Sequence, residues 1–290
     1  MRPHPASATA VLSAINAQTG SAYRLGERLS GGTRNSGAWL VDGPEGPAVL
    51  KWVPGESSPE PQRAAARTCE LLSRLGAPVP RYRSVGTVSG GAYAVMDLMP
   101  GSTMNPGSPR QIRELLSLVE LQKDQGFGAS EWPAQLVDRI TVGDGNYSYP
   151  GVMGDWSPEA RHLQQRARDI ARRGRSIACR TSDIVHQDMN PSNILAEHGH
   201  ISAIIDWENT TTGDRAWDVT EILFCAWEKT TVRGFIWERL CQLTSGESRS
   251  LYCADMAVSF ASGAMVHRSP EWANRCVRVG HELLDACRRI

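Results

Sequence analysis

Residues 184–208 read Ile-Val-His-Gln-Asp-Met-Asn-Pro-Ser-Asn-Ile-Leu-Ala-Glu-His-Gly-His-Ile-Ser-Ala-Ile-Ile-Asp-Trp-Glu. This stretch holds a His-x-Asp-x(4)-Asn constellation formed by His186, Asp188 and Asn193. An apolar run follows and ends at Asp206. A His-Gly pair in the middle of that run predicts a tight turn, so the run is expected to form a β-hairpin.

The polar residues of this motif suit the transfer of a phosphoryl group from a nucleoside triphosphate. A carboxylate at Asp188 can orient an attacking hydroxyl group and accept its proton late in the transfer. The amide of Asn193 and the carboxylate of Asp206 offer oxygen ligands for Mg²⁺, which bridges the β- and γ-phosphates. His186 is expected to orient the loop through hydrogen bonds and not to act as a base. ATP or GTP with Mg²⁺ is therefore the expected cofactor pair.

Lys51 is one of only three lysines in the chain and stands in the apolar segment 48–53. A lysine in such a strand either extends to solvent, as edge-strand lysines do, or meets an anion. With the downstream motif present, contact with the α- and β-phosphates is favoured. One strand upstream, a glycine-rich segment predicts either a phosphate-binding loop or an ordinary hairpin turn. Its candidate phosphate-binding residues are Gly31, Gly32, Thr33 and Ser36.

Composition and patterning indicate a globular protein with two parts. The 290 residues are 41% apolar, and the 31 basic and 31 acidic side chains balance, so no global field favours nucleic acid or a membrane surface. No apolar run is long enough to span a bilayer. Seven cysteines without CxxC pairing suit free thiols in a reducing cytoplasm. Cytoplasmic localisation is therefore expected, with monomer and homodimer both open.

Residues 20–100 are strand-rich, with strands predicted at 48–53 and 92–98 and a helix at 63–75 between them. After residue 100 the pattern becomes helical, and helix starts are marked by Ser-Pro pairs at 108–109, 157–158 and 269–270. We therefore expect an α+β protein with a β-rich nucleotide-binding lobe at 1–99 and a larger helical lobe at 100–290. The cleft between the two lobes is expected to hold the site.

Residues 25–224 resemble the aminoglycoside phosphotransferase family, a branch of the protein-kinase-like fold, most specifically in His-Gln-Asp-Met-Asn-Pro-Ser-Asn-Ile-Leu, Ile-Ile-Asp-Trp-Glu and Gly-Asp-x-x-x-Asp. The resemblance implies a two-lobed protein-kinase-like fold with a small antiparallel sheet in the N-terminal lobe. It also implies that Asp188 is the catalytic aspartate, that Asn193 and Asp206 are magnesium ligands, and that Lys51 binds phosphate.

By the same resemblance, residues 96–101 form the hinge, where backbone groups of Asp97 and Met99 meet the adenine. Two positions depart from the family. Gln187 stands where a glycine is usual, and we expect it to be tolerated. The helix that should carry a glutamate for Lys51 lacks one at the usual position, so either Glu70, more than a turn later, pairs with the lysine or the lysine lacks this partner.

The segment after the hairpin favours a small acceptor. Only seven residues separate Asp206 from Asp214, and no Ala-Pro-Glu follows, so a peptide-docking activation segment has no room. Asp218, which opens the next predicted helix, is expected to bind backbone N–H groups of the catalytic loop.

The expected activity is transfer of the γ-phosphate to a hydroxyl group of a small cationic antibiotic, such as an aminoglycoside, which would confer resistance. A cationic acceptor requires carboxylates and aromatic faces. Each candidate taken singly is better explained as a solvated helix charge or a core aromatic; the candidates are Asp144, Asp155, Trp227, Glu228, Asp255 and Trp272. The alternatives are a kinase for choline, homoserine or a sugar, a catalytically silent nucleotide-binding regulator, and a structural interaction module.

Overall fold

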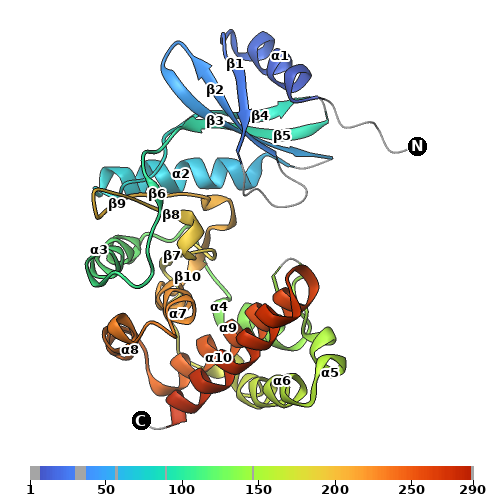
Figure 1. Cartoon of the computed structure of the whole chain (residues 1–290), viewed down its shortest axis with the longest axis vertical. Coiled ribbons are helices and arrows are strands. Elements are labelled where there is room, and N and C mark those ends of the chain that lie inside the picture. The colour runs from blue at the N-terminus through green and yellow to red at the C-terminus, as the bar shows by residue number, and fades with distance from the viewer. Residues whose placement is uncertain (1–6, 30–36, 56–57, 89, 146, 289–290) are drawn as a thin grey trace. The chain divides into compact units, whose positions relative to one another are not determined.

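The computed structural model describes residues 7–29, 37–55, 58–88, 90–145 and 147–288 (Figure 1). By their contacts these residues form two compact units, which are described one at a time. The β-rich unit consists of residues up to Thr103 together with Ser192–Thr210, and the helical unit consists of Met104–Pro191 and Thr211–Ile290. The residues after the catalytic motif thus group with the β-rich unit, and the division into lobes at 1–99 and 100–290 stays a prediction.

The β-rich unit is built on a five-stranded sheet with the order β1-β2-β3-β5-β4, in which all neighbours are antiparallel. Its strands are β1 (Arg24–Arg28), β2 (Gly37–Gly43), β3 (Gly46–Pro54), β4 (Tyr82–Val88) and β5 (Gly91–Asp97). The predicted strands at 48–53 and 92–98 correspond to β3 and β5. Alternation of apolar residues along β3 buries Ala48, Leu50 and Trp52 on one side, as expected for a half-covered sheet.

Two helices accompany this sheet. Helix α1 (Ala8–Thr19) begins after Ser7, whose hydroxyl accepts a hydrogen bond from the N–H of Ala10, and its buried face joins the core of the sheet. Helix α2 (Glu60–Arg74) corresponds to the helix predicted at 63–75 and begins three residues earlier. It contacts both β4 and the short 3₁₀ turn η5 (Trp207–Asn209).

The predicted hairpin is present. Strands β8 (Ile194–Glu197) and β9 (His200–Ile204) pair antiparallel and are joined at His198 and Gly199, whose φ values are 51° and 82°. Positive φ at both central residues is the geometry that two-residue hairpin turns require. Strand β6 (Ser102–Thr103) pairs with the other edge of β8. The hairpin brings residues 193 and 205 together, because the N–H of Ile205 donates to the carbonyl of Asn193 over 2.9 Å.

The helical unit contains eight α-helices among its described residues: α3 (Pro109–Val119), α4 (Trp132–Thr141), α5 (Met153–Trp156), α6 (Pro158–Ala171), α7 (Ala216–Cys225), α8 (Thr230–Leu243), α9 (Gly246–His267) and α10 (Pro270–Arg288). The 3₁₀ turns are η1 (Glu120–Gln122), η2 (Pro150–Val152), η3 (Gly174–Ser176) and η4 (Pro191–Asn193), the last of which crosses into the β-rich unit.

The predicted helix starts are confirmed, since the Ser108 and Ser157 hydroxyls accept hydrogen bonds from the first turns of α3 and α6, and α10 begins at Pro270. Helix α9 forms the centre of this unit and contacts α4, α6, α7 and α10.

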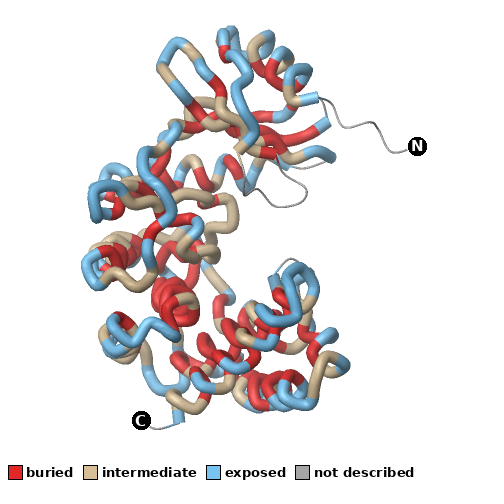
Figure 2. The backbone as a smooth tube through the Cα atoms, in the orientation of Figure 1, coloured by how far each residue is buried: buried red, intermediate tan, exposed pale blue. Residues whose placement is uncertain are grey.

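Helix α7 positions the predicted catalytic motif in the helical unit. Its residues Ala216–Phe224 are all buried, as the tube in Figure 2 shows. Strand β7 (Asp183–Val185), which leads into the motif, pairs antiparallel with β10 (Thr211–Gly213), which leads into α7. The motif and the helix are therefore held side by side by this short ladder.

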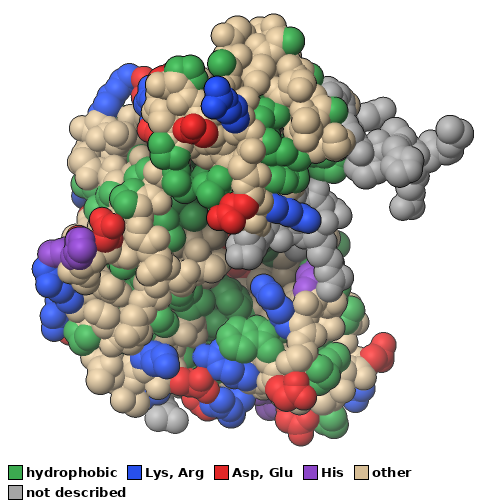
Figure 3. Space-filling view, turned by 45° about the horizontal axis from the view of Figure 1, so that its top comes forward, with side chains coloured by type: hydrophobic (Ala, Val, Ile, Leu, Met, Phe, Trp, Pro, Cys, Tyr) green, Lys and Arg blue, Asp and Glu red, His purple; other side chains and the backbone are tan. Residues whose placement is uncertain are grey.

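The distribution of charges on the surface agrees with the equal numbers of acidic and basic residues in the sequence. Acidic and basic side chains lie interspersed on the face of the protein shown in Figure 3. Of the helices that the structure describes, none has both the length and the apolar character needed to cross a membrane.

Candidate active site

The residues of the predicted site are shared between the two units. Lys51, Asn193 and Asp206 belong to the β-rich unit, whereas Asp188 and Asp218 belong to the helical unit.

Lys51 points to two carboxylates in the β-rich unit. Its Nζ lies 2.8 Å from Oδ1 of Asp206 and 3.0 Å from both carboxylate oxygens of Glu208. Strand β3 is the middle strand of the sheet, so the interpretation of Lys51 as an edge-strand lysine is wrong. Burial lowers the pKa of Lys51, but the two carboxylates outweigh burial and the net pKa is raised. The ammonium group is thus kept charged in a largely enclosed place.

Glu208 is a site residue that the sequence reasoning missed. It lies in η5, two residues after Asp206, and its side chain is only 15% exposed. The neighbouring Trp207 is buried and its indole N–H donates to the carbonyl of Ile204 over 2.9 Å, which anchors the turn that carries Glu208. Burial raises the pKa of Glu208, and the Lys51 ammonium counteracts this by favouring the carboxylate. The sequence did offer an indication of this role, because Glu208 is the last residue of the stretch 184–208 and follows Asp206 by only two positions.

The two predicted magnesium ligands lie at the same end of the hairpin. Asn193 precedes β8 and Asp206 follows β9, and Ile194 is paired with Ile204 between them. Asp206 adopts a left-handed conformation with φ 70° and ψ 54°, and its side chain is 41% exposed. Such a backbone conformation is costly for a residue with a Cβ and is concentrated at functional sites.

The suggested pairing of Glu70 with Lys51 is wrong. Glu70 is exposed on α2 and pairs with Arg74, one turn along the same helix. The side chains that α2 buries include Ala65, Thr68 and Cys69, none of which can act as a counter-ion for a lysine at neutral pH. The carboxylate partner of Lys51 comes instead from Glu208.

The remaining nucleotide-binding candidates are only partly described. Asp97 ends β5, and its carboxylate binds the guanidinium groups of Arg83 (2.7 Å) and Arg81 (3.3 Å), while its N–H donates to the carbonyl of Arg81. Met99 follows the strand and is half-buried. Their contact with adenine stays a prediction. Four candidates lie outside the described residues: Gly31, Gly32, Thr33 and Ser36.

In the helical unit, Asp218 holds the start of the predicted catalytic loop. Its Oδ2 accepts a hydrogen bond from the N–H of His186 (2.9 Å) and its Oδ1 accepts one from the N–H of Gln187 (3.1 Å). The amide of Gln122 donates to Oδ2 as well, over 3.1 Å. Burial raises the pKa of Asp218 to about 7, although the two backbone N–H groups favour the carboxylate.

Asp188 follows directly in this loop. Its N–H donates to Nδ1 of the fully buried His186 over 3.1 Å, so that ring nitrogen carries no proton. The Asn190 amide donates to the Asp188 carboxylate. His186 is therefore occupied in shaping the loop, which fits an orienting role.

Gln187 has a φ of 65°, which explains why a glycine suits this position. Its side-chain oxygen accepts a hydrogen bond from Nη1 of Arg139 over 3.2 Å. Arg139 is a buried residue of α4 that sequence reasoning missed, and its guanidinium lies 5.0 Å from the ring centroid of Trp217. Its Nε lies 3.3 Å from Oδ1 of Asp255.

Two of the acceptor-binding candidates are interior residues. Asp255 is fully buried, accepts a hydrogen bond from the indole of Trp217 over 2.8 Å and faces Arg139, so its role as a substrate ligand is wrong. Trp227 is 6% exposed and donates through its indole to Glu282 over 2.7 Å. Both side chains are already engaged in the core of the helical unit.

The other four candidates lie at the surface of the helical unit. Glu228 pairs with Arg275 and Arg278, and Trp272 is 42% exposed with the guanidinium of Arg275 over its ring at 4.5 Å. Asp144 caps the turn that follows α4 by accepting hydrogen bonds from the N–H groups of residues 147 and 148. Asp155 is exposed on α5. Their contact with an acceptor stays a prediction.

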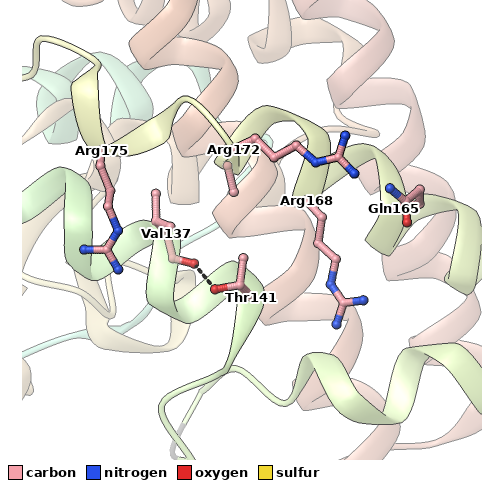
Figure 4. A pocket seen from close by; sticks show the side chains of 7 residues that line it. Val137, Thr141, Gln165, Arg168, Arg172 and Arg175 are labelled. Atoms are coloured by element: carbon pink, nitrogen blue, oxygen red, sulfur yellow. Dashed lines mark hydrogen bonds between the residues drawn. The ribbon is translucent and has the colours of Figure 1, made fainter.

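A cavity of about 460 Å³ lies elsewhere in the helical unit, against α4 and α6 (Figure 4). Its arginines point in different directions, and Arg172 and Arg175 pair with Asp169 and Asp138. The lining residues are Val137, Thr141, Gln165, Arg168, Ala171, Arg172 and Arg175. None of the predicted site residues lines this cavity, so it is not the candidate active site.

The ion pair of Lys51 gives a first prediction. Glu208→Gln removes one of the two carboxylates that face Lys51, so the free energy of unfolding at pH 7 should fall by about 1–3 kcal/mol in urea titrations. Glu70→Gln is the matched control, and because its ion pair is exposed it should change stability by less than about 0.5 kcal/mol. Equal effects of the two substitutions would contradict the assignment of Glu208 as the partner of Lys51.

The conformation of Gln187 gives a second prediction. Gln187→Gly and Gln187→Ala both lose the hydrogen bond to Arg139, but only alanine keeps a Cβ at positive φ. The glycine variant should therefore be more stable than the alanine variant by about 1 kcal/mol. Urea unfolding of the two variants measures this difference, and an alanine variant as stable as the glycine variant would argue against the left-handed conformation.

The chain is similar to known phosphotransferases in both sequence and fold. The sequence model of the APH family, described as the phosphotransferase enzyme family, matches residues 26–251. The solved aminoglycoside phosphotransferase APH(4)-Ia is 15% identical with a TM-score of 0.70, over 97% of this chain and 99% of that chain. A thermostable mutant of it, in a ternary complex with AMP-PNP and hygromycin B, is 18% identical with a TM-score of 0.70, over 96% and 99%.

Choline kinase LicA from Streptococcus pneumoniae is 12% identical with a TM-score of 0.63, over 94% of this chain and 96% of that chain. No protein with a curated description matches the sequence significantly. At these identities the structural likeness shows the fold, and the predicted two-lobed α+β protein-kinase-like fold is confirmed. Since the family match covers most of the sequence, the chain belongs to the APH phosphotransferase enzyme family.

Proposed function

We propose that the protein transfers the γ-phosphate of ATP to a hydroxyl group of a small cationic antibiotic, such as an aminoglycoside, and thereby confers resistance. The observation that supports this most is the 2.8 Å contact between Lys51 and Asp206. It joins the only lysine of the sheet to a carboxylate at the end of the hairpin. Cationic and anionic groups at this spacing suit the phosphates and the metal ion of a nucleotide.

Mg²⁺ would be held by Asp206 and Asn193. Carboxylate and amide oxygens are the hard donors that this ion prefers, and the 2.9 Å hydrogen bond from Ile205 to the Asn193 carbonyl keeps the two ends of the hairpin together. When bound, the ion would neutralise charge on the β- and γ-phosphates. Lys51 would contribute a second positive charge toward the phosphates, while Glu208 limits the movement of its ammonium group.

Asp188 would orient the acceptor hydroxyl group and take its proton late in the transfer. The hydrogen bonds of Asp218 and His186 to the loop backbone support this role, because they leave the Asp188 carboxylate on a segment with a defined conformation. ATP is favoured over GTP by the AMP-PNP complex of the APH(4)-Ia mutant, which has the same fold.

The nature of the acceptor rests on two observations. The short connection from Asp206 to Asp214 leaves no peptide-docking segment, and the APH(4)-Ia mutant of the same fold binds hygromycin B. The likeness to choline kinase LicA supports a metabolite kinase as the second candidate. The seven free cysteines agree with work in the reducing cytoplasm, either as a monomer or as a homodimer.

A coupled ADP-release assay with MgATP tests the proposal. The panel comprises hygromycin B and other aminoglycosides, cyclic-peptide antibiotics, macrolides, choline and homoserine. We expect turnover with one cationic antibiotic and a loss of about 10²–10⁴ in kcat for Asp188→Asn. Asp169→Asn, which alters an exposed carboxylate on α6, is the matched control and should keep wild-type activity.

Each alternative gives a different result in this assay. Turnover of choline or homoserine without any antibiotic would assign a metabolite kinase. Stabilisation by MgATP without any turnover would assign a silent nucleotide-binding regulator. A melting temperature unaffected by MgATP would indicate a structural module and overturn the proposal.

A further inference from the structure

The backbone N–H groups of the catalytic loop have a complete set of acceptors. Those of His186 and Gln187 donate to Asp218, and that of Asp188 donates to the His186 ring. The fourth, from Met189, donates to Oε2 of Glu221 over 2.6 Å. Four successive N–H groups outside any helix or sheet are thus all satisfied, which buried backbone requires.

Glu221 lies on the buried helix α7, three residues after Asp218, so the two carboxyl groups share one face of the helix. Its side chain is 3% exposed, and the N–H of Met189 is the hydrogen-bond donor that the described residues offer it. Burying a carboxyl group to this degree is costly unless the group is hydrogen-bonded or paired, so its bond to Met189 needs an explanation. Sequence reasoning did not single out this residue.

We propose that Glu221 is a positioning residue of the phosphotransfer reaction. With Asp218 it forms a cradle of two carboxyl groups that holds the peptide on either side of Asp188 and thereby sets the direction of the catalytic carboxylate. The inference rests on the proposed role of Asp188, and it adds a residue that acts on the loop backbone and does not touch the acceptor.

The surroundings of Glu221 favour its neutral form. Burial raises the pKa of Glu221 well above its usual value, and the negative charges of Asp188 and Asp218 act in the same direction. The N–H of Met189 and the guanidinium of Arg139 on α4 act against them. Cys225 of α7 also senses Glu221, and the pKa of its thiol is likewise raised, first by burial and then by the charge of Glu221. A neutral carboxyl still accepts the Met189 N–H through its carbonyl oxygen.

Two substitutions of Glu221 test whether the hydrogen bond from the Met189 N–H matters, because both keep a large side chain but only one keeps an acceptor oxygen. Glu221→Gln keeps an acceptor oxygen, so kcat should stay within about threefold of wild type. Glu221→Leu leaves the Met189 N–H without a partner, and kcat should fall by about ten- to a hundredfold. The KM for MgATP should stay within about twofold in both, because the predicted nucleotide ligands belong to another segment of the chain.

The reactions are run with MgATP and water as the acceptor, and again with the panel compound that turns over fastest. Glu238→Gln on α8, which removes an exposed carboxylate, is the matched control and should match wild type. Hydrogen exchange of the Met189 amide provides a readout without activity: protection should be retained in Glu221→Gln and lost in Glu221→Leu, while the core helices stay protected.

The pH dependence of stability gives an independent readout. A carboxyl group with a raised pKa in the folded state holds a proton that the unfolded chain releases above about pH 4.3. Wild type should therefore lose stability as the pH rises from 5 to 8, relative to Glu221→Gln, which has no such proton. The melting temperature of Glu221→Gln minus that of wild type should increase over this range.

Equal kcat and equal Met189 protection in the Gln and Leu variants would overturn the inference. A melting-temperature difference that does not change with pH would also count against it. If no panel compound is phosphorylated but the exchange and stability results are as expected, the proposed acceptor fails and the cradle stands. If an acceptor is phosphorylated equally well by both variants, the cradle alone fails.

Discussion

The central constraint in this protein is that residues 186–189 lie between a strand and a 3₁₀ turn, where three of their four backbone N–H groups need acceptors from outside the segment. Helix α7 supplies the acceptors, since Asp218 binds two of these groups at 2.9 and 3.1 Å and Glu221 binds a third at 2.6 Å. The arrangement requires two carboxyl groups in a buried helix, where burial raises the pKa of both. Because each carboxyl receives N–H donors, the cost of burying it is partly offset.

The β-rich unit also contains a largely buried polar group, and there ion pairs stabilise it. A lysine in the middle strand of a sheet needs a counter-ion, and Lys51 finds two in Asp206 and Glu208. Both carboxylates come from the segment that follows the hairpin, so the cation is tied to the end of β9 and not to α2. A magnesium ion at Asp206 would compete with Lys51 for that carboxylate, whereas Glu208 would retain the lysine in the same place.

Local patterns predicted the elements well. The apolar strands, the hairpin and the helices begun by Ser-Pro pairs were found because short-range spacing and capping chemistry specify them. Glu208 was not predicted as the partner of Lys51, because the family resemblance places that glutamate on α2. The candidate glutamate of α2, Glu70, lies on the exposed face of the helix. Asp255 was considered as a substrate ligand, yet its carboxyl lies fully buried beside Arg139. Whether a charged side chain faces solvent or a buried partner depends on elements far away in the sequence.

The sequence alone determined the phosphotransferase family and predicted its reacting residues, because His186, Asp188, Asn193 and Asp206 lie within one continuous stretch that folds locally into a loop and a hairpin. Tertiary structure alone decided which residues support that chemistry. Glu208, Glu221 and Arg139 act through contacts whose partners are 157, 32 and 48 positions away in the chain. Such pairings arise from the packing of helices and strands, and no periodicity within a short window encodes them.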